Sequence, residues 1–194
     1  MNTLSGQVRS ITLATLATLT LAIGASAQTT AAAPSVRMRI DNFARVSDTY
    51  FRGAQPIGSD YADLAKLGIK TVINLIGDSD LDSMEQSSVE KQGMHYVIIP
   101  MSTRKAPTPQ QLETFLAIVN DAKSQPVFVH CVGGRHRTGV MTAVYRMITD
   151  GITGVEAFKE MKRFNFGPDF LHPEFKRFVY EFDAKKPVLA NAGG

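Results

Sequence analysis

The only cysteine of the chain, Cys131, lies in the stretch "VFVHCVGGRHRTG", among glycines and cationic side chains. Gly133 and Gly134 permit backbone angles that other residues resist. A tight turn there would point backbone N–H groups inward, and a following helix would add its positive N-terminal end. Such a cup fits an oxyanion such as phosphate. Arg137, six positions after Cys131, could donate two hydrogen bonds to two of its oxygens.

The same positive field would act on the sulfur of Cys131. Helix N-termini and nearby cations favour the thiolate, which is the nucleophilic form of cysteine. We therefore predict Cys131 and Arg137 as catalytic residues, the first attacking phosphorus and the second holding its oxygens. Thr138 is expected to donate its hydroxyl to the sulfur, and His130 to orient the loop by hydrogen bonds to the backbone. The predicted substrate-binding residues are those of the turn: Val132, Gly133, Gly134, Arg135, His136 and Arg137.

The alternative without chemistry is a structural cysteine in a glycine turn, since a lone cysteine usually acts as a small buried hydrophobic residue. That alternative explains the thiol. It does not explain the arginine at the sixth position, the two glycines and the adjacent threonine together.

The elements that must position the turn alternate between strands and helices. Apolar stretches at 70–76, 94–100 and 126–130 indicate buried strands, and shorter strand-like pieces lie on either side of Ser47 and Asp48. This alternation predicts a single α/β domain with a mainly parallel central sheet of about four or five strands, flanked by helices. Ligands of such sheets bind at the carboxyl ends of the strands, which is where Cys131 lies.

Helix signals fill the intervals between the strands. Thr108 and Gln111 predict a capping box for a helix that runs to about residue 124, and Thr153 and Glu156 predict another. Pro173 is expected to begin the last helix. The other predicted helices span 59–68, 82–93 and 138–150.

The stretch "HCVGGRHRTG" resembles the H-C-x5-R-T signature of cysteine-dependent protein tyrosine phosphatases, most closely the compact dual-specificity branch. The stretches "NFARVSDTYFRGAQP" and "LAKLGIKTVINL" are similar to the amino-terminal half of atypical dual-specificity phosphatases of plants and fungi and of exported bacterial relatives. The resemblance covers about residues 40–182. It implies a dual-specificity-phosphatase-like fold, a phosphocysteine on Cys131 that water hydrolyses, and no metal or other cofactor.

The chain departs from this family pattern in the loop at 100–109, "PMSTRKAPTP", where an aspartate commonly serves as general acid. The loop contains no Asp, Glu or His, and the matching position falls near Thr103. The general acid is therefore unknown, and the spacing singles out none of the candidates. These candidates are His136, Asp78, Asp80, Asp82 and Asp169.

Three functions stay open at this point. The first is a phosphoric monoester hydrolase of the protein tyrosine or dual-specificity type, acting on a phosphorylated protein or a small phosphoester. The second is a phosphatase of inositol phosphates or pyrophosphates; the phosphoanhydride bond of a pyrophosphate has a leaving group that needs less protonation than that of an alkyl phosphate. The third is a catalytically weak phosphate- or phosphopeptide-binding pseudophosphatase. A sulfurtransferase or arsenate reductase fits less well, because arsenate reduction usually needs further thiols and the chain has one cysteine.

The N-terminal segment of the chain predicts export. Arg9, the apolar run "ITLATLATLTLAIG" and "ASA" at 25–27 form the pattern of a signal peptide over residues 1–27. We expect a flexible segment at 28–39, the phosphatase domain at 40–184, a loose tail at 185–194, and a periplasmic or secreted monomer without a membrane span after signal cleavage. The net charge of +3 is too small to indicate a nucleic-acid partner. Two cationic groups, Arg104–Lys105 and 135–137, either converge on one rim or form separate clusters.

Overall fold

The computed structural model describes residues 38–77 and 80–186, and they belong to one compact unit. The predicted signal peptide, nearly all of the segment 28–39, Asp78 and most of the predicted tail lie outside these residues. Within the described part of the chain, no helix has both the length and the apolar character needed to cross a membrane.

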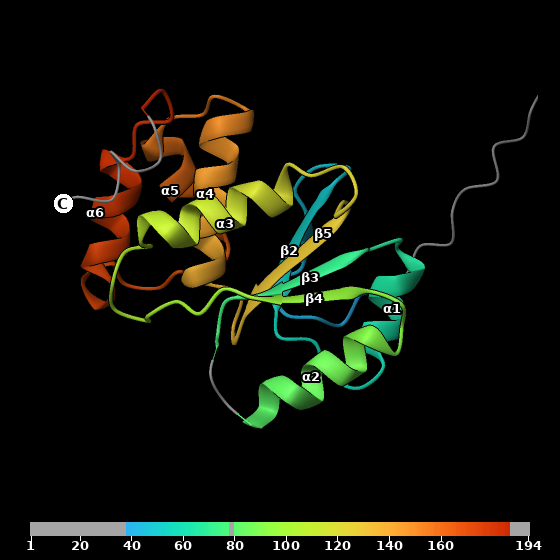
Figure 1. Ribbon diagram of the computed structural model, residues 1–194. Helices are drawn as coiled ribbons and strands as arrows, with labels where there is room; N and C mark the ends of the chain where they lie inside the picture. The colour runs from blue at the N-terminus through green and yellow to red at the C-terminus, as the bar shows by residue number, and fades with distance from the viewer. Residues whose placement is uncertain (1–37, 78–79, 187–194) are drawn as a thin grey trace, which may run out of the picture. The chain divides into compact units, whose positions relative to one another are not determined.

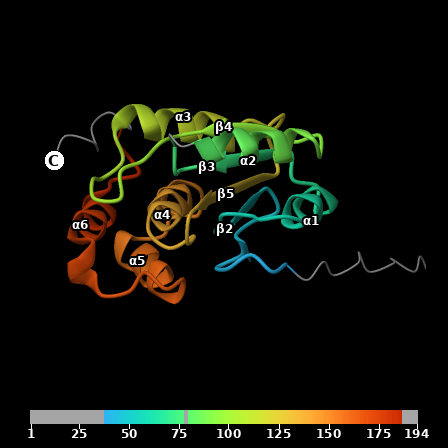
Figure 2. The same ribbon diagram turned by 90° about the horizontal axis from the view of Figure 1, so that it is seen from below.

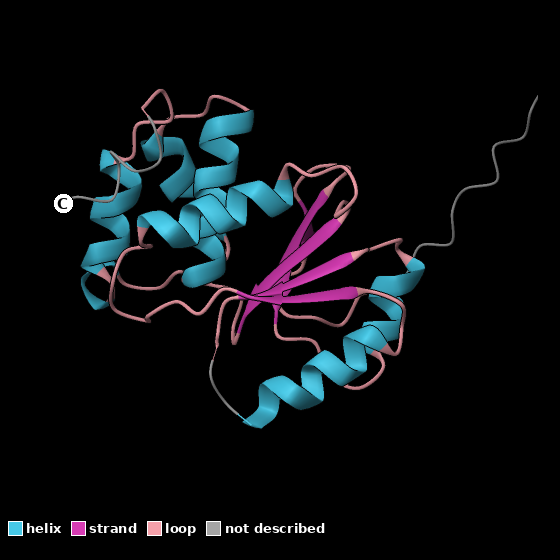
Figure 3. Ribbon diagram, viewed as in Figure 1, coloured by secondary structure: helices cyan, strands magenta, loops and turns pink. Residues whose placement is uncertain are grey.

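A five-stranded sheet forms the centre of the domain, as predicted (Figure 3). Its strands lie in the order β1-β2-β5-β3-β4, and only β1 runs antiparallel to its neighbour. Their bounds are β1 Ala44–Arg45, β2 Tyr50–Ala54, β3 Thr71–Asn74, β4 His95–Ile98 and β5 Val127–Cys131. The strand that ends in the cysteine is therefore the middle strand, covered by a neighbour on each edge.

Helices cover both faces of the sheet (Figures 1 and 2). Helices α1 (Asp60–Lys66) and α2 (Asp80–Glu90) pack on one face, around Phe128. The other face holds the larger core and packs against four helices: α3 (Pro109–Val119), α4 (Arg137–Thr149), α5 (Gly154–Arg163) and α6 (Pro173–Glu181). Because side chains alternate along a strand, Val127, Val129 and Cys131 of β5 all face this second layer.

Local capping signals set several helix boundaries. The capping boxes of Thr108 with Gln111 and of Thr153 with Glu156 both form, and Pro173 begins α6. Helix α3 ends at Val119, earlier than the predicted position near 124. Asp121 accepts hydrogen bonds from Lys123 N and Ser124 Oγ, and such side-chain bonds compete with helical ones.

Candidate active site

The loop between β5 and α4 has three successive carbonyl groups tied to its surroundings. Val132 O accepts from the backbone N–H of Gln55 at 3.2 Å. Gly133 O accepts from Asn42 Nδ2 at 2.7 Å, and Gly134 O accepts from Arg52 Nη2. In a planar trans peptide the C=O and N–H groups point in opposite directions. With the carbonyl groups held outward, the N–H groups of the same peptides face the inside of the loop, as an anion nest requires.

Gly134 is the position where this loop requires glycine. Its φ is +64°, in the left-handed region that residues with a Cβ resist. A Cβ there would also lie 2.5 Å from Gly53 C and 2.6 Å from Ala54 N. The loop therefore rests against the end of β2 at a separation that only a hydrogen at this position allows.

Arg137, the first residue of α4, donates hydrogen bonds to three backbone oxygens. Its Nη1 donates to Leu75 O at 3.2 Å, Ile76 O at 3.4 Å and Met101 O at 3.3 Å. Within the described residues, its Nε and Nη2 have no hydrogen-bond partner of their own. One edge of the guanidinium is thus fixed to the chain just beyond β3 and β4. The other edge is available to an anion.

A cavity of about 380 Å³ opens over the loop, within the size range of ligand pockets. Cys131 is almost fully buried, with 4% of its surface exposed, whereas Val132 is 61% exposed. The cavity brings together most of the predicted site residues and two others. Its lining is Thr103, Cys131, Val132, Gly133, Arg135, His136, Arg137 and His172.

Residues 35–175 of the chain match the profile of the family described as "DSP-PTPase phosphatase fused to NAD+ Kinase". The chain belongs to this family of dual-specificity phosphatases. The phosphatase is 29% identical over 153 residues to the dual specificity protein phosphatase TpbA of Pseudomonas aeruginosa, covering 79% of this chain and 68% of TpbA. It is 30% identical over 156 residues to the "Probable tyrosine-protein phosphatase DG1060" of Dictyostelium discoideum, covering 78% and 91%.

Solved structures agree with this assignment. The crystal structure of P. aeruginosa TpbA superposes with a TM-score of 0.65 at 27% identity, over 79% of this phosphatase and 92% of TpbA. A cysteine-to-serine variant of TpbA has been crystallised in complex with phosphotyrosine. The catalytic core of the inositol-pyrophosphate phosphatase SIW14 from S. cerevisiae has the same fold, with a TM-score of 0.64 at 22% identity over 76% and 88% of the two chains.

His130 and Thr138 flank the loop of the phosphatase and are both fully buried. The prediction that His130 hydrogen-bonds to the backbone is wrong, because its Nε2 faces Glu85 Oε1 at 3.0 Å instead. Its Nδ1 has no partner within the described residues. Thr138 Oγ1 likewise has no partner among them, so its hydroxyl proton is not committed elsewhere.

Glu85 of α2 is the centre of a buried polar cluster beneath the loop. Besides His130, the donors to its carboxylate are Gln55 Nε2, Tyr61 Oη, Asn74 Nδ2 and Tyr96 Oη, at 3.1–3.4 Å. Burial acts to raise the pKa of Glu85, but the hydrogen bond and the charge of His130, together with the hydrogen bonds from Gln55 and Tyr96, outweigh it, and the pKa is lowered. The sequence contains no local signal for this cluster, since its six members come from six different elements or loops.

Arg52 is a second residue that the sequence analysis missed. It is fully buried, and its guanidinium carbon lies 3.9 Å from the centroid of the Phe164 ring. Burial lowers the pKa of Arg52, and the charges of Tyr50 and Cys131 act in the opposite direction. Arg52 belongs to "YFRGAQP", part of a stretch that resembles other dual-specificity phosphatases. That resemblance was the only sequence signal that could have indicated a role for Arg52.

Of the two predicted general-acid candidates whose side chains the structure describes, His136 lines the cavity and Asp169 does not. Asp169 is turned away and lies 2.8 Å from both Lys162 Nζ and Lys176 Nζ. Its pKa is lowered by the hydrogen bonds from these two lysines. Asp78 lies outside the described residues, and Asp80 and Asp82 belong to α2 but their side chains are outside the described part. A histidine that was not predicted, His172, lines the cavity beside Thr103.

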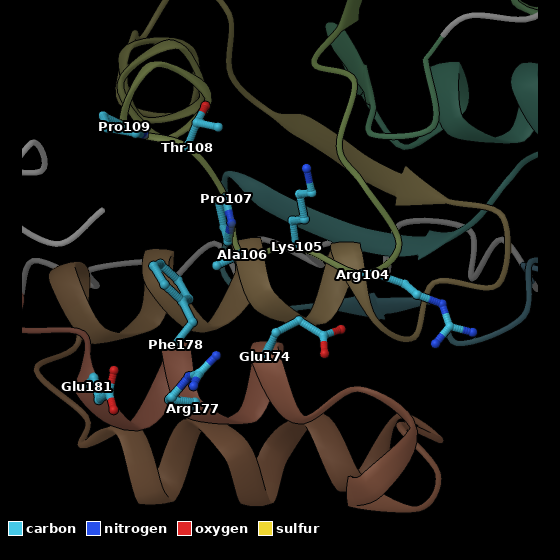
Figure 4. A pocket seen from close by; sticks show the side chains of 10 residues that line it. All are labelled: Arg104, Lys105, Ala106, Pro107, Thr108, Pro109, Glu174, Arg177, Phe178 and Glu181. Carbon is cyan, nitrogen blue, oxygen red and sulfur yellow. The ribbon is translucent and has the colours of Figure 1, made fainter. Parts of the chain in front are cut away.

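The two cationic groups of the sequence line two separate cavities. Arg135, His136 and Arg137 line the cavity over Cys131. Arg104 and Lys105 line a neighbouring one, between the loop at 100–109 and α6 (Figure 4). Arg177 adds a third cation there, and Glu174 and Glu181 offset the charge. The hypothesis of a single cationic rim is therefore not supported.

Proposed function

We propose that this phosphatase hydrolyses phosphate monoesters through a phosphocysteine on Cys131, and that phosphotyrosine is its preferred substrate class. The observation that carries the proposal is the loop itself: its carbonyl groups are tied outward and its nucleophile lies at the bottom. The exposed side chain of Val132 at the mouth of the cavity supports an aromatic phosphoester, because it offers apolar contact to a ring. The phosphotyrosine complex of TpbA supports the same substrate class.

The reaction proceeds in two displacements. The sulfur of Cys131 attacks phosphorus, the bond to the leaving oxygen breaks, and the charge on the equatorial oxygens is met by loop N–H groups and Arg137. In the second displacement, water attacks phosphorus, the P–S bond breaks, and inorganic phosphate departs. The hydroxyl of Thr138 donates a hydrogen bond to the sulfur as it leaves.

Hydrolysis of p-nitrophenyl phosphate by wild type, Cys131→Ser and Arg137→Ala tests the proposal. The serine variant should show no turnover, and the alanine variant should lose about 10²–10³ in kcat, as expected when a donor to a developing charge is removed. Mass spectrometry of quenched wild type should show a phosphoryl adduct on Cys131. Phosphotyrosine peptide binding without an adduct or turnover would instead identify a pseudophosphatase.

A second candidate substrate class is the inositol pyrophosphates, favoured by Arg104, Lys105 and Arg177 in the neighbouring cavity. The two glutamates of that cavity weaken its attraction for a polyanion, so we rank this class below aryl phosphates. Comparing kcat/KM for a phosphotyrosine peptide and for an inositol pyrophosphate decides between them. A higher value for the pyrophosphate, reduced in Arg104→Gln, would reverse the ranking.

We also propose that the enzyme is exported and cleaved after Ala27, which rests on Arg9, the apolar run and the A-x-A site. The domain would then begin after a short flexible segment and act as a monomer. The mass of the protein recovered from a bacterial periplasmic fraction tests the cleavage site, and light scattering tests the oligomeric state. An intact N-terminus on protein confined to the cytoplasm would overturn the export proposal.

A further inference from the structure

His172 of the segment between α5 and α6 lies where the general acid is missing from the loop at 100–109. We propose that His172 is the proton donor to the leaving oxygen and then the base that activates water. This inference rests on the proposed hydrolysis through Cys131 and adds its missing proton transfer. His172 lines the same cavity as Cys131 and Arg137, so a bound phosphoester would contact all three.

The backbone of Thr103 fixes the orientation of the imidazole ring. His172 Nδ1 lies 3.2 Å from Thr103 O, and a carbonyl oxygen can only accept, so Nδ1 carries a proton. Within the described residues, Nε2 has no protein partner. Thr103 is the position at which the sequence lacked an acid, and its main chain now holds one supplied by another segment, 69 residues away.

Glu174 supplies a negative charge near Nδ1, the ring nitrogen that donates to Thr103 O. Its Oε1 is buried without a hydrogen-bond partner among the described residues, and it lies 3.6 Å from His172 Nδ1. A buried carboxylate oxygen without a donor is costly, and a protonated imidazole beside it offsets that cost. The close view of the neighbouring cavity shows Glu174 on α6, near Arg177 of the same helix and across from the loop residues (Figure 4).

His136, the other histidine of the cavity, is not available for this task. Its Nε2 lies 2.8 Å from Phe166 O, so the N–H at this position is donated to a carbonyl. Burial lowers the pKa of His136; the bond to Phe166 O acts against that, and the positive charges of His172, Arg135 and Arg137 lower it further. The two rings lie 3.9 Å apart between centroids. Two charged imidazoles this close would repel each other strongly, so the proposal requires the charge to be on His172, the ring that lies beside Glu174.

The proton balance closes with this single residue. In the first displacement, the P–O bond breaks and the leaving oxygen takes the proton from His172 Nε2, which becomes neutral. In the second, Nε2 takes a proton from the attacking water while the P–S bond breaks and Cys131 returns to its thiolate. The titratable and charged groups around the ring are Glu174 of the following helix α6, His136, Arg135 and Arg137 of the loop, and the sulfur of Cys131.

A series of aryl phosphates with leaving groups of different acidity tests the proposal in wild type and two variants. An asparagine amide overlies Nδ1, so His172→Asn keeps a donor for Thr103 O and removes the Nε2 proton. His172→Gln instead places an amide near Nε2 that cannot transfer a proton. Both variants should lose about 10²–10⁴ in kcat/KM with phenyl phosphate. Both should approach wild type with 2,4-dinitrophenyl phosphate, whose leaving group needs no proton, and this activity also shows that the variant is folded.

A matched control is His95→Asn, at an exposed histidine of β4 outside this cavity, which should behave as wild type throughout. The basic limb of the kcat/KM profile against pH should be present in wild type and absent in both His172 variants. Equal losses for all leaving groups, or no loss for any, would overturn the role of His172 while Cys131-dependent turnover stands. If wild type turns over no aryl phosphate at all, the proposed function itself fails, and this inference with it.

Discussion

The guanidinium of Arg52 donates a hydrogen bond to the carbonyl oxygen of Gly134, 82 residues further along the chain. The bond joins the middle of β2 to the tightest point of the phosphate loop. Arg52 is fully buried, and its Nε has no hydrogen-bond partner among the described residues. It contacts the Gly134 carbonyl and the face of the Phe164 ring, and the charges of Tyr50, Cys131 and Glu160 favour its protonated form. Arg52 does not line the cavity over Cys131. Its hydrogen bond holds the Gly134 carbonyl outward, and this keeps the N–H group of the same peptide directed toward an anion in the loop.

Replacing this cation should therefore harm catalysis more than folding. In Arg52→Met, we expect kcat/KM for p-nitrophenyl phosphate to fall about 10- to 100-fold, corresponding to the roughly 1.5–3 kcal/mol of one hydrogen bond to a charged group. The melting temperature should stay level or rise, since an apolar side chain of similar volume removes a buried charge. Arg45→Met is the control, because Arg45 is an exposed arginine on β1 that pairs with Asp48. Wild-type kcat/KM in Arg52→Met would contradict this role.

The two neighbouring glycines of the loop should differ in how much stability an alanine substitution removes. Gly134→Ala would force a Cβ against the backbone of Gly53 and Ala54 at a φ of +64°. Gly133→Ala would meet only the flexible side chain of Arg135, at 3.5 Å or more. Since left-handed backbone alone costs roughly 1–2 kcal/mol for a residue with a Cβ, we expect Gly134→Ala to lose at least about 2 kcal/mol in urea unfolding. The Gly133→Ala variant should lose clearly less; equal losses would refute the argument from close approach.

The parts of this architecture that are encoded locally could be predicted from the sequence. The strand, glycine turn and helix around Cys131 are contiguous, and the capping boxes at Thr108 and Thr153 each span four residues. Arg52 and His172 were missed because their partners lie 82 and 69 residues away and neither has a periodic or spacing signal. The absence of an acid near Thr103 was visible in the sequence. That His172 lies beside Thr103 could be found only from the fold.

Glu85 should make the stability of the enzyme depend on acid pH. Its pKa is lowered in the folded state, so the unfolded chain takes up the proton first as the pH falls. The stabilisation is complete above the usual glutamate pKa of about 4.3 and is lost as the pH drops through the lower folded value. In Glu85→Gln, we expect a loss of about 1–3 kcal/mol at pH 7 and a weaker dependence on pH below about 4.3 than in wild type.

Thermal unfolding followed by circular dichroism between pH 3 and pH 7 measures this difference. Glu90→Gln, at the exposed end of the same helix, is the control and should follow wild type at every pH. If Glu85→Gln were as stable as wild type at pH 7, the buried carboxylate would not be holding His130 and the base of the loop together.

The charge assigned to His172 should be visible in the titration of its neighbour. The pKa of His136 is lowered by burial first, and the charge of His172 lowers it further. In His172→Asn, we therefore expect the pKa of His136 to rise toward its ordinary value of 6.5 while staying below it, because burial and the two arginines of the loop remain. Two-dimensional ¹H–¹⁵N NMR of the imidazole rings measures this shift. Replacing the exposed His95 by Asn should leave it unchanged. An unaltered His136 titration in His172→Asn would mean that His172 carries no charge at the start of the reaction, and that the leaving oxygen must draw its proton from elsewhere.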